Sequence, residues 1–392
     1  MASVPEQTPP AGGWAALDGS HRLVAVEVLR HGPLPRSELS RRLGLSPGSL
    51  TRLTRPLVDS GLLVEGTTAV HVRTGRPSLP LDVRPGSRQF VGVKITADEL
   101  YAVVTDLRAE VLAEHVRPLP GRDPDAVVAA VAEVVAELRA AHPDVTALGV
   151  GIGGLAVGHR HVVVARFLGW TDVPLADRLA AATGLPTVVD NDVRALTAAE
   201  HWFGDGRGRH SFALLTIGAG VGCGVVVHDR VVEGAHGAGG SVGHRPFGAG
   251  GVCREGHRGC TDAVLTSSSV AGGVAQAIGR PVTYAEALQL ARDGHPAAQR
   301  VVGDAGRALG LLITDIANLM DPALVILSGE GVGIVELARP ELDATLAEHR
   351  SGAAPPVELA VRPIPFTGWA RGGAAVAIQD HVLGRADPVT SP

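Results

Sequence analysis

The stretch from Gly234 to Asp262 contains the residues best suited to chemistry. Two cysteines, Cys253 and Cys260, lie in a glycine-rich loop that also carries His244 and His257. Thiolate and imidazole groups are the usual ligands of zinc in proteins. Three cysteines in 392 residues are too few for a disulfide framework. The loop therefore predicts either a metal site or a pair of free thiols, rather than a disulfide bridge.

A second group of candidate residues lies near the N-terminus. Apolar residues at helical spacing predict helices over residues 21–30, 36–43 and 47–60. Ser46 and Pro47 mark the start of the third helix, because serine caps free backbone amides and proline at the first helical position loses no hydrogen bond. A helix, a short helix, a turn and a third helix together predict a helix-turn-helix.

Two short strands joined by a Gly-Arg-Pro tip follow, and they predict the wing of a winged helix. Residues 18–84 carry ten arginines against six acidic residues, which suits a polyanionic partner. We expect contacts with DNA phosphates or bases from the third helix and the wing tip; a winged helix that binds protein is the alternative. The candidate DNA-binding residues are Ser46, Ser49, Thr51, Arg52, Arg55, Arg73 and Arg76.

From residue 89 onward the pattern is that of an α/β protein. Strands are predicted at 90–95, 100–105 and 147–152, and helices at 123–141 and 170–183. Two similar β-hairpins start about 120 residues apart, which predicts two related halves around a cleft. No apolar run is long enough to cross a membrane, so we expect a cytoplasmic protein that does not bind membranes.

Five motifs in a fixed order make the chain resemble the ROK family (repressors, open reading frames and sugar kinases), in its repressor branch. The resemblance extends from about residue 18 to residue 378 and implies a winged helix-turn-helix followed by a two-lobed actin-like body. It also implies a homodimer or homotetramer. We expect a disordered lead at 1–17, the DNA-binding domain at 18–84, the ROK body at 88–380 and a flexible tail at 381–392. The motifs are Gly151-Ile-Gly-Gly-Leu155, Asp190-Asn191-Asp192, Thr216-Ile-Gly-Ala-Gly-Val-Gly222, the segment from Gly234 to His244, and Cys253-x-Glu-Gly-x-x-Gly-Cys260.

The resemblance implies roles for several residues of the predicted cleft. Asp192 matches the catalytic aspartate of the kinases, and Asn191 matches a neighbour that binds sugar; capping of the following helix is the alternative for both. His244 matches a histidine that contacts sugar and zinc. Asp262 and Ser241 each stand where the family usually has a sugar-binding glutamate. The candidate effector-binding residues are Asn191, Asp192, Ser241, His244, Asp262 and Lys94.

Two departures from the family pattern argue against kinase activity. Lys94 replaces the aspartate of the first phosphate motif, and a cation cannot recruit magnesium. Ala219 replaces a hydroxyl residue of the second phosphate motif. We therefore expect no enzyme activity, with Asp192 as a vestigial base, and no bound ATP or magnesium. Lys94 could instead neutralise Asp192 or meet an anionic ligand such as a sugar phosphate.

The zinc loop also departs from the family pattern. The family site has one histidine and three cysteines, and the matching residues here are His244, Cys253, Glu255 and Cys260. Glutamate can bind zinc, and His257 could serve in its place. A bound zinc ion would be structural; a loop without metal is the alternative.

These features predict a DNA-binding transcriptional regulator, most simply a repressor of carbohydrate-related genes. A sugar or sugar derivative in the degenerate kinase cleft would release it from a double-stranded DNA operator. Two other functions are open. One is a residual ATP-dependent sugar kinase, and the other is a regulator that works without a ligand and has a vestigial cleft.

Overall fold

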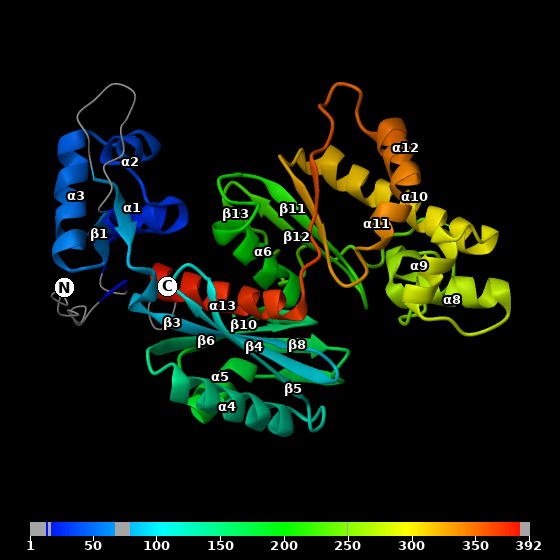
Figure 1. Cartoon of the computed structure of the whole chain (residues 1–392), viewed down its shortest axis with the longest axis horizontal. Helices are drawn as coiled ribbons and strands as arrows, with labels where there is room; N and C mark the ends of the chain where they lie inside the picture. Colours follow the sequence, from blue (N-terminus) through cyan, green and yellow to red (C-terminus); the bar gives the residue numbers. More distant parts are fainter. Residues whose placement is uncertain (1–12, 15–16, 67–78, 249, 385–392) are drawn as a thin grey trace. The chain divides into compact units, whose positions relative to one another are not determined.

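The computed structural model describes residues 13–14, 17–66, 79–248 and 250–384 (Figure 1). The expected lead and tail lie mostly outside these residues. The chain divides into two compact units. The first unit comprises Met1–Ala195, Trp202–Gly208 and Trp369–Pro392, and the second unit comprises Leu196–His201 and Arg209–Gly368.

The first unit begins with the elements of a winged helix. Asp18 caps the first helix by accepting a hydrogen bond from the His21 backbone amide, and Ser46 caps the third helix by accepting one from Ser49. The two strands pair antiparallel, with Leu63 opposite Val83. The elements are α1 (Gly19–His31), α2 (Arg36–Leu43), α3 (Pro47–Asp59), β1 (Leu63–Glu65) and β2 (Leu81–Val83).

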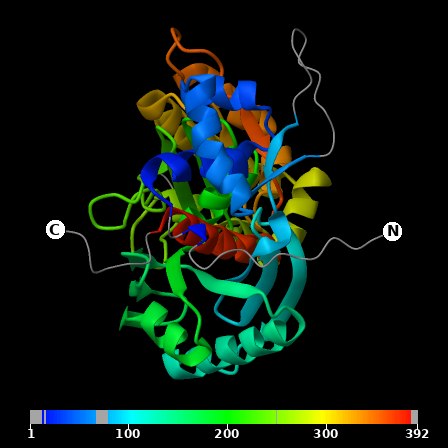
Figure 2. The same cartoon turned by 90° about the vertical axis from the view of Figure 1, so that its left-hand side faces the viewer.

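A five-stranded sheet in the order β10-β6-β3-β4-β5 follows in the first unit. Strands β3 to β5 form an antiparallel meander, while β6 and β10 run parallel to β3. Helices α4 (Pro124–Ala141) and α13 (Phe366–Leu383) cover opposite faces of this sheet (Figures 1 and 2). The strands are β3 (Gln89–Ile95), β4 (Glu99–Asp106), β5 (Val111–Pro118), β6 (Val145–Ile152) and β10 (Thr187–Asn191).

One predicted helix is partly wrong. The expected helix over 170–183 is a strand, β9 (Trp170–Val173), followed by the helix α5 (Leu175–Thr183). Pro174 lies between the strand and the helix. Proline disfavours helical geometry in the residue before it, so the helix cannot extend back through Val173. Strand β9 completes a small three-stranded sheet with β7 (Leu155–Val157) and β8 (His161–Ala165).

Helix α13 packs unusually close to the main sheet of the first unit. A Cβ atom on Gly149 of β6 would overlap the backbone of Gly373 in α13, so only glycine allows this approach. Further along α13, Ala377 and Ile378 share a hydrophobic core with Val24 of α1. The Arg22 guanidinium also donates a hydrogen bond to the Leu383 carbonyl over 3.0 Å. Helix α13 therefore connects the main sheet with the winged helix.

The second unit repeats the hairpin-and-parallel-strand plan of the first. Its sheet has the order β13-β12-β11-β14-β15, in which β11 pairs antiparallel with β12 and parallel with β14. The strands are β11 (Phe212–Ile217), β12 (Val221–Val227), β13 (Arg230–Val231), β14 (Val325–Ser328) and β15 (Leu359–Val361). The helices are α7 (Thr261–Leu265), α8 (Ser267–Ile278), α9 (Tyr284–Arg292), α10 (Pro296–Met320), α11 (Ile334–Leu337) and α12 (Arg339–His349).

The two hairpins confirm the predicted internal repeat and the α/β class. Helix α6 (Asp192–Phe203) begins directly after β10, as the sequence indicates. Among the described residues, no helix is both long enough and apolar enough to span a membrane.

Candidate DNA-binding surface and effector site

Helix α3 separates buried and exposed residues cleanly. Leu50, Thr54 and Leu57 are buried against the rest of the winged helix. Arg52 and Arg55 are exposed on the opposite face. That exposed face offers hydroxyl and guanidinium donors side by side, which are the groups that contact phosphates and base edges of DNA.

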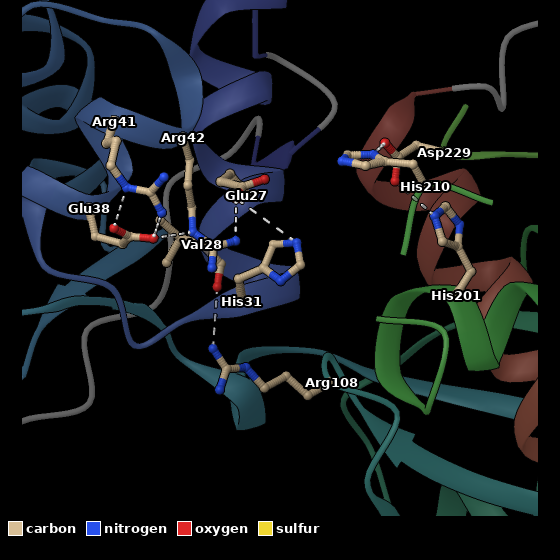
Figure 3. A network of polar contacts seen from close by, with 10 residues as sticks. All are labelled: Glu27, Val28, His31, Glu38, Arg41, Arg42, Arg108, His201, His210 and Asp229. Carbon is tan, nitrogen blue, oxygen red and sulfur yellow. Dashed lines mark hydrogen bonds and ion pairs between the residues drawn. The ribbon is translucent and has the colours of Figure 1, made fainter. Parts of the chain in front are cut away.

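The arginines of α2 and α3 differ in their partners. In α2, Arg41 and Arg42 both donate hydrogen bonds to Glu38 and hold the pKa of that carboxyl down to about 2 (Figure 3). In α3, Arg52 has no hydrogen bond or ion pair within the described part of the chain. Arg55 has only a 3.8 Å contact with Asp59, and its side chain is 82% exposed. The α3 cations are therefore the ones available to an external anion.

The remaining candidate DNA-binding residues have different positions. The Ser46 hydroxyl accepts from the Ser49 amide and lies 2.9 Å from the Ser49 hydroxyl, so both side chains help to form the start of α3. The Thr51 hydroxyl is exposed and donates to the Pro47 carbonyl. Arg73 and Arg76 of the predicted wing tip lie outside the described residues.

Two candidate effector residues lie where β10 ends and α6 begins. The Asn191 side-chain oxygen accepts hydrogen bonds from the backbone amides of Val193 and Arg194, and its amide donates to the Gly154 carbonyl over 2.8 Å. One oxygen of Asp192 accepts from the Val193 amide over 2.9 Å. The Asn191 side chain thus caps α6, which is the alternative role for this residue, and Asp192 binds one free amide of the first turn.

Lys94 pairs with Asp192 inside the first unit. Its ammonium forms an ion pair with the second carboxylate oxygen of Asp192, and the two side chains are only 7% and 13% exposed. The Lys94 nitrogen also lies 5.2 Å from the centre of the Trp369 ring, at the start of α13, within the range of a cation–π contact. The chain's lysine therefore meets a carboxylate and an aromatic ring of the same unit.

Asp262 and Ser241 lie in the second unit. The Asp262 carboxylate accepts a hydrogen bond from the Val221 amide over 3.1 Å, and burial raises the pKa of this carboxyl. The exposed Ser241 hydroxyl donates to the Ala238 carbonyl over 2.8 Å. The carboxylate of Glu330 accepts a hydrogen bond from the Ala219 amide, two residues before Val221. Glu330 is not among the residues that the sequence points to, although the Ser-Gly-Glu-Gly turn from Ser328 to Gly331 is a signal.

The predicted zinc loop brings several ligand atoms together. Ligand atoms of His244, Cys253 and His257 lie within 4.8 Å of one another. The Cys260 sulfur lies 3.8 Å from Nδ1 of His244. Glu255 does not join this group, because its carboxylate lies 3.2 Å from the other ring nitrogen of His244, Nε2. Two thiols and two imidazoles are a suitable donor set for zinc.

Comparisons with known proteins define the family. The ROK family model matches residues 90–360, and a winged helix-turn-helix DNA-binding model matches residues 26–64. The chain belongs to the ROK family and carries an N-terminal winged helix-turn-helix.

Relatives of two kinds resemble the chain. A putative xylose repressor of Caldicellulosiruptor sp. (strain Rt8B.4) is 25% identical over 340 residues, which cover 82% of this chain and 85% of the repressor. A glucokinase of Streptomyces coelicolor is 29% identical over 258 residues, which cover 61% of this chain and 81% of the kinase. The crystal structure of a ROK family transcriptional regulator, a homologue of the E. coli MLC protein, is similar with a TM-score of 0.79 and 26% identity, covering 94% of this chain and 99% of the other.

The expected family and fold class are therefore confirmed. The match with the regulator extends over nearly the whole chain, whereas the match with the glucokinase is shorter. A DNA-binding module on a sugar-kinase-like body is the organisation of a transcriptional regulator.

Proposed function

We propose that this ROK-family regulator represses carbohydrate-related genes and leaves its operator when a sugar or sugar derivative binds. One observation carries this proposal. A winged helix whose α3 arginines are available to an external anion is joined to a kinase-like body in which Lys94 neutralises the candidate base, Asp192. The relatives of similar length include a protein named as a putative xylose repressor. Because a repressor must reach its operator DNA, we also propose that the protein acts in the cytoplasm.

The state of Asp192 supports a regulator rather than a kinase. A general base needs an oxygen within reach of the sugar hydroxyl. One oxygen of Asp192 accepts from the Val193 amide, and the other is paired with Lys94. A phosphoryl-transfer site also needs a metal ligand where Lys94 carries a positive charge. We therefore propose that the protein is not an enzyme and binds neither ATP nor magnesium.

Helix α13 offers a route from the Lys94–Asp192 pair to the winged helix. Trp369 near its start contacts the Lys94 ammonium, and Ile378 near its end packs in the core that contains Val24 of α1. A ligand that contacts the Lys94–Asp192 pair would act on the same rigid element that supports the winged helix. We propose that the effector shifts a two-state equilibrium through α13. A homodimer or homotetramer would present paired winged helices to two half-sites of the operator.

Binding of an effector is tested by thermal unfolding with a panel of sugars and sugar phosphates. A ligand at one hundred times its dissociation constant stabilises the folded state by about 2.7 kcal/mol, which raises the unfolding temperature by several degrees. We expect one sugar class to give this shift.

Ser241→Ala should weaken binding of that sugar about fivefold through loss of one hydroxyl. Ser351→Ala, on an exposed residue of the same unit, is the control. A panel without any shift would instead support a regulator that works without a ligand.

We also propose that the loop binds a structural zinc ion through His244, Cys253, His257 and Cys260. The Glu255 carboxylate at Nε2 of His244 would orient that ring, as carboxylates commonly do for zinc-bound histidines. The ion would fix the loop between Ser241 and Cys260.

Elemental analysis of the purified protein tests this metal site. We expect about one zinc ion per chain, and loss of most of it in Cys253→Ser. Cys223→Ala is a matched control, because Cys223 is buried in β12 and belongs to no ligand group among the described residues. Equal zinc content in wild type and Cys253→Ser would contradict the assignment.

A further inference from the structure

The turn between β11 and β12 holds a carboxylate supplied by the chain itself. The Ala219 backbone amide donates a hydrogen bond to Oε1 of Glu330 over 2.6 Å. A Cβ atom built on Gly218 would overlap the Glu330 carboxylate, so this group lies directly against the turn backbone. Backbone amides exposed in a glycine-rich turn are a common binding site for anions.

The position of Glu330 is fixed by its neighbours. The Gly331 amide donates to the Ile217 carbonyl over 2.7 Å, and the Tyr284 hydroxyl donates to the Gly331 carbonyl over 2.6 Å. Gly329 has a φ of +94° and contacts the backbone of Ile217 so closely that a side chain would not fit. The turn that carries Glu330 is thereby held against the end of β11.

A second carboxylate binds the same turn from another segment. Asp262, at the start of α7, accepts a hydrogen bond from the Val221 amide over 3.1 Å. Two neighbouring amides, at Ala219 in the turn and at Val221 where β12 begins, therefore each hold a carboxylate oxygen. Asp262 follows Val221 by 41 residues in the sequence, and Glu330 follows Ala219 by 111 residues. Two independent acidic contacts indicate that the turn selects negatively charged oxygen.

We propose that the β11–β12 turn is an anion-binding site whose anion is the Glu330 carboxylate, which excludes phosphoryl groups from the turn. A phosphoryl oxygen at the Ala219 amide would have to displace Glu330 and would meet repulsion from Glu330 and Asp262. The replacement of a hydroxyl residue by Ala219 removes one donor only, whereas Glu330 occupies the Ala219 amide and Asp262 occupies the Val221 amide. This inference goes beyond the proposed regulator function and does not depend on an effector or on DNA.

Isothermal titration with ATP and with inorganic pyrophosphate, both without magnesium, tests the inference. Glu330→Gly should bind both probes at least about tenfold more tightly than the wild type, because it frees the Ala219 amide to donate to the phosphoryl group and removes a like charge. Glu330→Gln keeps the shape of the side chain and should give a smaller gain, of about threefold. Glu336→Gln is the control, because Glu336 is an exposed acid of the following helix, α11.

The two probes separate the phosphoryl site from other binding. A gain for both ATP and pyrophosphate in Glu330→Gly supports the inference. Equal affinity in wild type and variant overturns it, and so does a gain for ATP alone, because such a gain would come from the nucleoside. If Glu330→Gly does not fold, the comparison of Glu330→Gln with Glu336→Gln decides the question. Release of DNA by sugar is a separate property, so its failure would leave this result unchanged.

Discussion

Replacing Arg52 and Arg55 together with alanine weakens binding to operator DNA by about 100-fold, since each contact of this kind contributes roughly 1–3 kcal/mol. Both guanidinium groups are exposed on α3. Within the described residues, Arg55 has only the 3.8 Å contact with Asp59, and Arg52 has no hydrogen bond or ion pair. Fluorescence anisotropy with DNA from the region upstream of the gene measures the loss. A lower salt dependence in the double variant would identify phosphate contacts, because each lost phosphate contact reduces the slope by about one.

Arg41→Ala provides the matched control for this experiment. Arg41 is also an exposed arginine of the winged helix, but it is paired with Glu38 on α2. Its replacement should change DNA affinity by less than about threefold. If the α3 double variant binds as tightly as the wild type, or if Arg41→Ala has the larger effect, the assignment of α3 as the DNA-contacting helix is wrong.

Lys94→Met destabilises the protein by about 3 kcal/mol or more, because it leaves the Asp192 carboxylate nearly buried without its cation. The double variant Lys94→Met/Asp192→Leu should recover much of this loss, since a buried ion pair can often be replaced by apolar side chains of similar volume. Urea unfolding of the full-length protein measures both variants.

An exposed ion pair of the same unit serves as the control. Arg160 pairs with Asp177, and both side chains are about half exposed. Arg160→Met should therefore cost less than about 1 kcal/mol. If Lys94→Met costs no more than Arg160→Met, or if the double variant is no more stable than Lys94→Met, Lys94 is not the group that keeps the Asp192 carboxylate neutralised.

The winged helix and the α/β class could be predicted because their signals are local. Ser46 and Pro47 mark the start of α3 by capping chemistry, and apolar spacing marks its buried face. Helix α13 gave no such signal, because Gly372 and Gly373 lie within it and glycine disfavours helices. The close approach of Gly373 to β6 explains these glycines, and that contact depends on the assembled sheet.

The arrangement of the sites depended on contacts between distant segments. Pairing of Lys94 with Asp192 was one of two alternatives, and only the placement of β3 and β10 on either side of β6 distinguishes them. The contact of Glu330 with Ala219 requires the parallel pairing of β14 with β11. Likewise, the sequence indicates that either Glu255 or His257 accompanies the cysteines, and the tight turn after Cys253 brings the His257 ring toward Cys253.

The most direct test of the central claim is the affinity of the purified protein for its upstream DNA, measured by fluorescence anisotropy with and without each member of a panel of mono-, oligo- and phosphosugars. The account predicts tight, salt-sensitive binding that one class of sugar weakens by at least about tenfold, which corresponds to a coupling free energy of about 1.4 kcal/mol. DNA binding that no sugar changes, or no binding to this DNA at all, would contradict a sugar-released repressor.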